Sequence, residues 1–225
     1  MSSYQESKAI IDLSHPIRPE MQVFQAKWHR KVEFESLGQI EDVGRRTTHI
    51  HMGTHVGTHI DAPSHFIQDG KSITDFKLDR FVGDCTFIDL SATPPKTEIT
   101  VQMIEKAIGN SKIHKRLVFY FNWARFFGDP YFYSDQPFLG NEAATWILAL
   151  RPELLGYDLA MPDNPKDGQG TGCDSPMHKI FLGAGIPLLE SMNIKEKLDD
   201  EFTLIALPLL LSGLDGSPVR CVAIQ

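Results

Sequence analysis

Five histidines and one aspartate are concentrated between residues 49 and 65 of this 225-residue chain. The densest part of this segment has the pattern His55-x3-His59-x-Asp61-x3-His65. Imidazole and carboxylate groups together favour zinc, manganese or iron, whereas calcium takes oxygen ligands alone. The residue types and their spacing therefore predict a site for a divalent transition-metal ion.

The backbone that carries these ligands is expected to be extended but bent. The histidines and the aspartate occupy odd positions with mostly apolar or small residues between them, and this period of two is typical of a strand. In a straight strand His55 and His59 would lie about 13 Å apart, which is too far to share one ion. Interspersed β-branched residues, glycines and a proline argue against a helix. We therefore predict a bend at Gly57 that brings His55 back to His59 and Asp61.

His49 and His51 continue the alternation but lie outside the core of the pattern. We expect them to support the ligands or to line the pocket, in a structural or a functional role. For a lone histidine a solvated or hydrogen-bonded strand face would be the default interpretation. Five alternating histidines with an aspartate in phase favour a metal site instead.

Several segments resemble one enzyme family. HVGTHIDAPSHF is similar to the signature of the metal-dependent cyclase family of hydrolases, which includes bacterial kynurenine formamidases and isatin hydrolases. IIDLSHPIRPEMQVF near the N-terminus resembles the opening strand and loop of the family. HKIFLGAGIPLLESM and ALPLLLSGLDGSPVRCVAI resemble its closing blocks, so that the likeness covers nearly the whole chain.

The resemblance implies a set of metal ligands. By position, His55, His59 and Asp61 correspond to the ligands of a first ion, and Asp61 also to a ligand of a second. His178 and Glu190, twelve residues apart as in the family, would complete the second site. The expected cofactor is zinc or manganese, with one or two ions per chain.

Further roles and two departures follow from the same resemblance. His65 corresponds to the proton donor and acceptor of the family, and Phe24 stands where formamidases place a tryptophan against the substrate. In the block that resembles Gly-x-Asp-x-x-Ser-x-Asp, residues 156–163, Met161 replaces the serine while Asp163 is kept. Residues 164–176 form a Gly/Pro-rich insertion that is either a surface loop or a lid over the pocket.

The expected reaction is hydrolysis of a small amide, formamide or cyclic amide by metal-activated water, with His65 moving the proton. A lactone would suit the same chemistry. A metal-dependent binding protein without turnover is a second alternative, although it would not need His65. A hydrolase with a Ser or Cys nucleophile is a third, but the sequence has no Gly-x-Ser-x-Gly elbow.

The bulk properties favour one cytoplasmic enzyme domain over residues 1–225. The hydrophobic content of 42% suffices for a large core, and the net charge of -7 disfavours a nucleic-acid partner. Cys85, Cys173 and Cys221 are few and far apart, as in a reducing compartment. We see no signal peptide and no apolar run long enough for a membrane. The substrate is expected to be a small molecule, and the family resemblance suggests a homodimer or homotetramer.

Hydrophobic periodicity predicts both strands and helices. The expected helices cover 100–108, capped by Thr100, 141–150, capped by Asn141, and 175–184. Strands are expected over 9–13, 85–90, 116–123, 154–160 and 186–191, followed by a final pair, 202–211 and 219–224, joined by the turn GLDGSP. This mixture indicates an α/β fold, and the resemblance implies the swivelling β/β/α type with a small barrel-like sheet. The aromatic cluster at 121–133 is typical of a core or a subunit interface, and the alternative is that some of its rings wall an aromatic substrate pocket.

Overall fold

The computed structural model describes residues 8–168 and 171–225. Within these residues one mixed sheet of nine strands forms the frame of the molecule. Its strands are β1 (Ile10–Asp12), β4 (His59–Asp61), β5 (Val82–Asp89), β7 (Arg116–Tyr120), β9 (Leu154–Tyr157), β10 (Leu188–Glu190), β11 (Glu201–Ile205), β12 (Gly216–Pro218) and β13 (Val222–Ile224).

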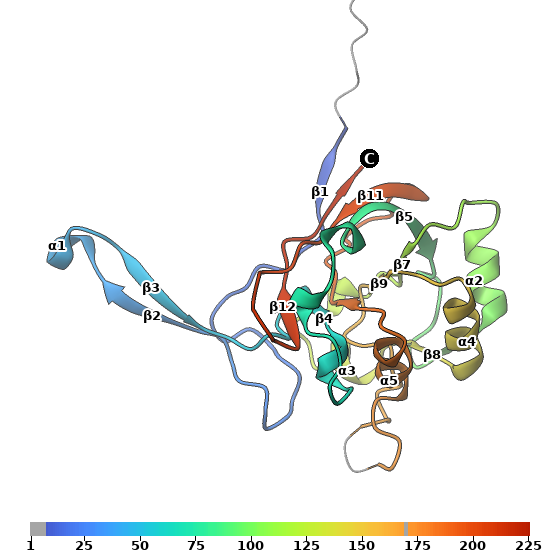
Figure 1. The fold of residues 1–225 in the computed structure, drawn as a ribbon, viewed down its shortest axis with the longest axis horizontal. Coiled ribbons are helices and arrows are strands. Elements are labelled where there is room, and N and C mark those ends of the chain that lie inside the picture. Colours follow the sequence, from blue (N-terminus) through green and yellow to red (C-terminus); the bar gives the residue numbers. More distant parts are fainter. Residues whose placement is uncertain (1–7, 169–170) are drawn as a thin grey trace, which may run out of the picture.

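The strand order is β1-β13-β11-β5-β7-β9-β10-β4-β12. The centre of the sheet is parallel, from β5 through β7 and β9 to β10, and all other pairs are antiparallel. The sheet curls into a half-barrel (Figure 1). This confirms the α/β fold with a barrel-like sheet that the sequence suggested.

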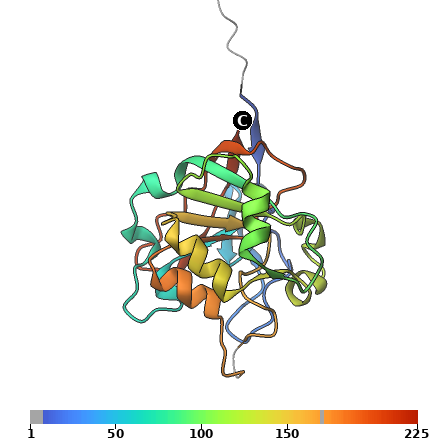
Figure 2. The same ribbon diagram turned by 90° about the vertical axis from the view of Figure 1, so that its right-hand side faces the viewer.

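Three helices cover one face of the sheet and lie side by side in Figure 2: α2 (Val101–Ile108), α4 (Asn141–Ala149) and α5 (Pro176–Gly183). The remaining elements are short: α1 (Ile40–Val43), α3 (Tyr131–Ser134), the 3-10 turns η1 (Pro63–His65), η2 (Ile73–Asp75), η3 (Leu78–Arg80) and η4 (Ala124–Phe126), and the strand pairs β2 (Glu33–Gly38) with β3 (Thr47–His51) and β6 (Glu98–Ile99) with β8 (Phe138–Leu139). None of the helices in the described residues has the length and apolarity that a membrane crossing requires.

Strand β7 shows how the core is built. All five of its residues are buried. Leu117 and Phe119 pack into the cluster formed with the covering helices, whereas Val118 and Tyr120 point into the concave side of the sheet. Both faces are covered, which explains why the strand reads as a continuous apolar run. Burial of each such side chain contributes about 1.5–3 kcal/mol. The centre of the sheet is therefore a rigid support for the side chains at the ends of its strands.

The helix starts agree with the sequence in one case and differ in another. The Thr100 side chain accepts a hydrogen bond from the backbone N–H of Met103 at 3.3 Å, which confirms the predicted cap of α2. Asn141 is not a cap: it is the first helical residue of α4, and Gly140 precedes it in an extended conformation. A side chain at position 140 would meet the carboxyl end of Glu98, which would have to move to make room for it.

Two strand predictions were wrong in an informative way. The predicted strand 116–123 ends at Tyr120, because the buried carboxylate of Asp158 accepts the backbone N–H groups of Phe121 and Trp123. At the C-terminus, β11 pairs with β13 as expected, but GLDGSP is no simple turn between them. Residues 216–218 form β12, which pairs with β4 at the far edge of the sheet.

The segment from Glu33 to His51 forms a projecting arm. Strands β2 and β3 pair antiparallel, with α1 at the tip, and extend away from the rest of the described chain (Figure 1). Every residue of the two strands except Gly38 is exposed. The arm therefore has little contact with the core that stabilises the sheet.

Candidate metal centre and active site

Gly57 bends the histidine segment as predicted. The chain leaves the extended conformation between residues 54 and 58, and Gly57 has a φ of 60°, in the left-handed region that favours glycine. The bend turns His55 back toward β4, where its Nδ1 lies 2.6 Å from Oδ1 of Asp61. Two side chains that a straight strand would separate thereby meet at one point.

Asp61 is the centre of the cluster, and its two oxygens face different histidines. Oδ1 lies 2.6 Å from Nδ1 of His55 and 3.2 Å from Nε2 of His59. Oδ2 lies 3.5 Å from Nε2 of His178 and 4.0 Å from Nε2 of His65. The residue is 1% exposed. One buried carboxylate can thus contribute an oxygen to each of two neighbouring cation positions.

Glu190 approaches the same histidines from the adjacent strand. Strand β10 pairs antiparallel with β4 in a register that sets Glu190 opposite His59. Its Oε2 lies 3.6 Å from Nε2 of His59, and its Oε1 lies 3.2 Å from Nε2 of His178. The hydroxyl of Tyr157 donates a hydrogen bond to Oε1 at 2.8 Å, which holds the carboxylate in place.

The structure brings all five predicted ligands and His65 together. Two overlapping groups have potential ligand atoms within 4.8 Å of one another, and both contain Asp61: His55, Asp61 and His65, and His59, Asp61 and Glu190. His65 belongs to the first of these groups, so its position suits a metal ligand as well as a proton carrier.

The buried charges of the cluster favour a cation. Asp61 and Glu190 are both nearly inaccessible to solvent. Burial lowers the pKa of His55, but attraction by Asp61 and hydrogen bonds with two carboxylates outweigh burial and raise this pKa to about 10. The pKa of His178 is likewise raised despite burial, first by the charge of Glu190. A set of imidazoles and carboxylates in such a field fits a divalent transition-metal ion.

His65 follows β4 on the 3-10 turn η1 and lies closer to solvent than the other histidines of the cluster. Its side chain is 20% exposed, compared with 8% for His59. The ring stacks on His55 with the centroids 3.8 Å apart. His65 therefore lies at the boundary between the buried cluster and the cavity.

Asp215 is a member of the site that the sequence reasoning missed. Its Oδ2 lies 2.8 Å from Nε2 of His55 and 3.4 Å from Nδ1 of His65, and its Oδ1 accepts a hydrogen bond from the hydroxyl of Thr54 at 3.0 Å. Hydrogen bonds with His55 and His65 hold the pKa of Asp215 far below its usual value. A carboxylate on the second nitrogen of a ligand histidine orients the ring and fixes its tautomer. The only sequence signal for Asp215 was the segment GLDGSP, which is typical of a turn.

Asp163 has a similar relation to His178. Its buried carboxylate accepts hydrogen bonds from Nδ1 of His178 and, at 2.6 Å, from the backbone N–H of Met177. This leaves Nε2 of His178 directed toward Asp61 and Glu190. The sequence block 156–163 contains Asp163, but nothing in it indicated a contact with His178.

A cavity of about 960 Å³ opens over the cluster. Phe24, the predicted substrate contact, lies in its wall, where its ring is 5.8 Å from that of Tyr133 in an edge-on arrangement. The wall has further aromatic or apolar side chains, Trp28, His29, Phe66 and Met161, together with polar and charged ones such as Gln22, Gln25, Lys27 and Lys179. The volume and the lining suit a small molecule with an aromatic ring.

The insertion at 164–176 borders this cavity. Pro165, Asp167, Gly168 and Asp174 are in its wall, whereas residues 169 and 170 lie outside the described residues. This position favours a role in shaping the cavity over that of a plain surface loop. His49 and His51, in contrast, do not line the cavity, so that expectation was wrong. They lie on the arm, beside Glu35.

Comparison with known proteins identifies the family of this chain. Residues 11–164 match the family described as "Putative cyclase". The kynurenine formamidase of Bacillus cytotoxicus is 30% identical over 226 residues, which cover 94% of this chain and 95% of that protein. The kynurenine formamidase of Bacillus anthracis is 31% identical with the same coverage of both chains. The chain therefore belongs to the cyclase family, as its motifs implied.

Solved structures share the fold. An isatin hydrolase A from Labrenzia aggregata, bound to benzyl benzoate, superposes with a TM-score of 0.85 at 24% identity and covers 96% of this chain and 93% of its own. A structure described as a potential metal-dependent hydrolase with cyclase activity has a TM-score of 0.76 at 23% identity, with coverage of 97% and 98%. These neighbours support the swivelling β/β/α type expected from the resemblance.

Proposed function

We propose that this chain is a metal-dependent hydrolase that cleaves the C–N bond of a small non-peptide amide, such as an aryl formamide or a cyclic amide. One observation carries the proposal: Asp61 and Glu190 are buried among four histidines at the floor of a cavity. The similarity to kynurenine formamidases supports an amide C–N bond as the bond that is cleaved.

The metal would be held by residues that already face one another. His55, His59 and Asp61 would hold one ion, and the second oxygen of Asp61 would join His178 and Glu190 around another. Zinc or manganese suits these donors. When bound, a divalent cation lowers the pKa of water and polarises a carbonyl group.

The remaining chemistry belongs to the side chains of the protein. His65 would take a proton from the attacking water and return it to the leaving nitrogen. Asp215 contacts Nδ1 of His65 and stabilises the imidazolium that forms in between. Phe24 and Tyr133 offer ring edges and faces to an aromatic substrate, which supports the predicted role of Phe24.

The alternatives are less well supported. A lactone would fit the same cavity and chemistry. A binding protein without turnover would not need a histidine between the ligands and solvent. A cysteine nucleophile has no support, because Cys85 and Cys221 are buried in the core and Cys173 is not in the cavity wall.

Removal of metal tests this function. Dialysis of the purified protein against a chelator should abolish hydrolysis of N-formyl arylamines or isatin, and Zn²⁺ or Mn²⁺ should restore it, because activated water is the nucleophile. Chelator already saturated with zinc is the control. Full activity after complete loss of metal would contradict the proposal. Turnover of lactones alone would support the first alternative, and binding without turnover the second.

We also propose that the protein is a homodimer or homotetramer. The arm supports this, because it exposes large apolar side chains that a second copy could cover: Phe34, Leu37, Ile40, Val43 and Ile50. Light scattering should give a multiple of the chain mass of 25.3 kDa. Leu37→Glu with Ile40→Glu should lower that mass, and a single-chain mass for the unaltered protein would refute the proposal.

A single domain over residues 1–225 and a cytoplasmic location stay predictions. Strands from both ends of the described chain join one sheet, which supports the first. All three cysteines are unpaired thiols in the structure, which is in keeping with a reducing compartment. Fractionation of cells that express the protein would test its location.

A further inference from the structure

The arm carries a second group of possible metal ligands on one of its faces. In the register of β2 and β3, Glu35 lies opposite His49 and Glu33 lies opposite His51. Residues two apart on a strand point the same way, so two carboxylates and two imidazoles share one face of the ribbon. None of the four lines the catalytic cavity.

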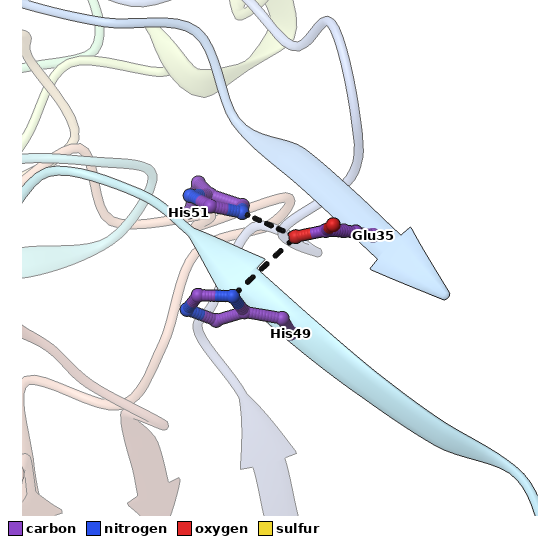
Figure 3. A group of neighbouring side chains, drawn as sticks. All are labelled: Glu35, His49 and His51. Carbon is purple, nitrogen blue, oxygen red and sulfur yellow. Dashed lines mark hydrogen bonds and ion pairs between the residues drawn. The ribbon is translucent and has the colours of Figure 1, made fainter. Parts of the chain in front are cut away.

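Three of these side chains converge on one point, as Figure 3 shows. Oε2 of Glu35 lies 3.1 Å from Nε2 of His51 and 3.5 Å from Nδ1 of His49. The two imidazole rings are 4.2 Å apart. The three potential ligand atoms all lie within 4.8 Å of one another.

These separations suit a metal ion, and without one they also allow the hydrogen bond between His51 and Glu35. Four ligands at about 2.1 Å around a tetrahedral zinc ion stand about 3.4 Å from one another. The two distances from Glu35 to the histidines bracket this value. Two imidazoles and one carboxylate are also a ligand set that zinc accepts. All three side chains are about half exposed, so an ion can reach them from solvent.

We propose that Glu35, His49 and His51 bind a divalent transition-metal ion such as Zn²⁺, separately from the catalytic centre. Water or the carboxylate of Glu33 completes the coordination. The ion joins β2 to β3 outside the core. A two-stranded ribbon is marginally stable by itself, so the bound metal stabilises the arm.

The test counts zinc ions on the intact protein. After incubation with Zn²⁺ and removal of excess, native mass spectrometry should find one more ion per chain in the unaltered protein than in Glu35→Gln or His51→Gln. Titration with Zn²⁺ should show that both variants bind the ion at this site at least about tenfold more weakly. Residues that only hydrogen-bond to a metal ligand already change metal affinity by about that factor, and a ligand itself should change it at least as much. Glu41→Gln, which removes the same charge from the exposed α1 of the same arm, is the matched control and should behave like the unaltered protein.

Hydrogen exchange gives a second measurement that does not depend on catalysis. Zn²⁺ should slow amide exchange in residues 33–38 and 47–51 of the unaltered protein and of Glu41→Gln, but not of Glu35→Gln. Asp61→Asn should keep this response, because the arm does not need the catalytic centre. Equal zinc content and equal exchange in Glu35→Gln and the unaltered protein would overturn the proposal.

Discussion

Replacement of Asp61 by asparagine should strip the catalytic centre of metal and abolish hydrolysis. Asp61 gives one oxygen to the side of His55 and His59 and the other to the side of His178, so both cation positions lose a ligand together. A bound metal ion stabilises the transition state by several kcal/mol, so its loss should lower the rate at least about 10³-fold. Metal analysis and kcat/KM on the same sample measure both effects.

Asparagine has the shape of aspartate, so it separates the charge from packing. Asp84→Asn is the matched control, because Asp84 is an exposed residue of β5 far from the cluster in the sheet order, and it should change neither quantity. The thermal midpoint of Asp61→Asn should be compared with that of the unaltered protein after chelation, because we expect neither sample to contain the metal ion. If Asp61→Asn retains its metal and its rate, the assignment of the centre is wrong.

Replacement of His65 by alanine should lower turnover by about 10² to 10⁴-fold while the metal stays bound, since a positioned acid–base group contributes that much. His65 lies at the edge of the cluster, with Nε2 4.0 Å from Asp61, and its side chain is more exposed than that of His59. The measurement is kcat over a pH range together with the metal content. His114→Ala, which removes a histidine paired with Glu201 outside the cavity, is the control.

Loss of metal in His65→Ala would show that His65 is a ligand, and an unchanged rate would show that it has neither role. Asp215→Asn distinguishes the proton carrier further. Oδ2 of Asp215 lies 3.4 Å from Nδ1 of His65 and 2.8 Å from Nε2 of His55, so loss of its charge should leave both rings less firmly oriented. The rate should fall by about 10 to 100-fold, as for other partners of metal-site histidines.

Local pattern was enough to predict much of the site. The alternation from His49 to His65, with Gly57 in its middle, predicted a kinked strand, and the structure has that bend. The interval between His178 and Glu190 indicated a second metal site only through the family resemblance. The alternation could not show that His49 and His51 leave the site, because a period of two continues unchanged along the arm.

The amino-acid sequence by itself determined the ligand types, the bend and the mixture of strands and helices, because these depend on residue chemistry and on spacing within a few positions. Only the tertiary structure decided which distant carboxylates complete the site. Asp215 reaches His55 because β12 pairs with β4 at the sheet edge, and Asp163 reaches His178 at the start of α5. The first contact joins residues 160 positions apart through the strand order of the sheet, and the second joins a loop residue to a helix, so spacing within a few positions reveals neither.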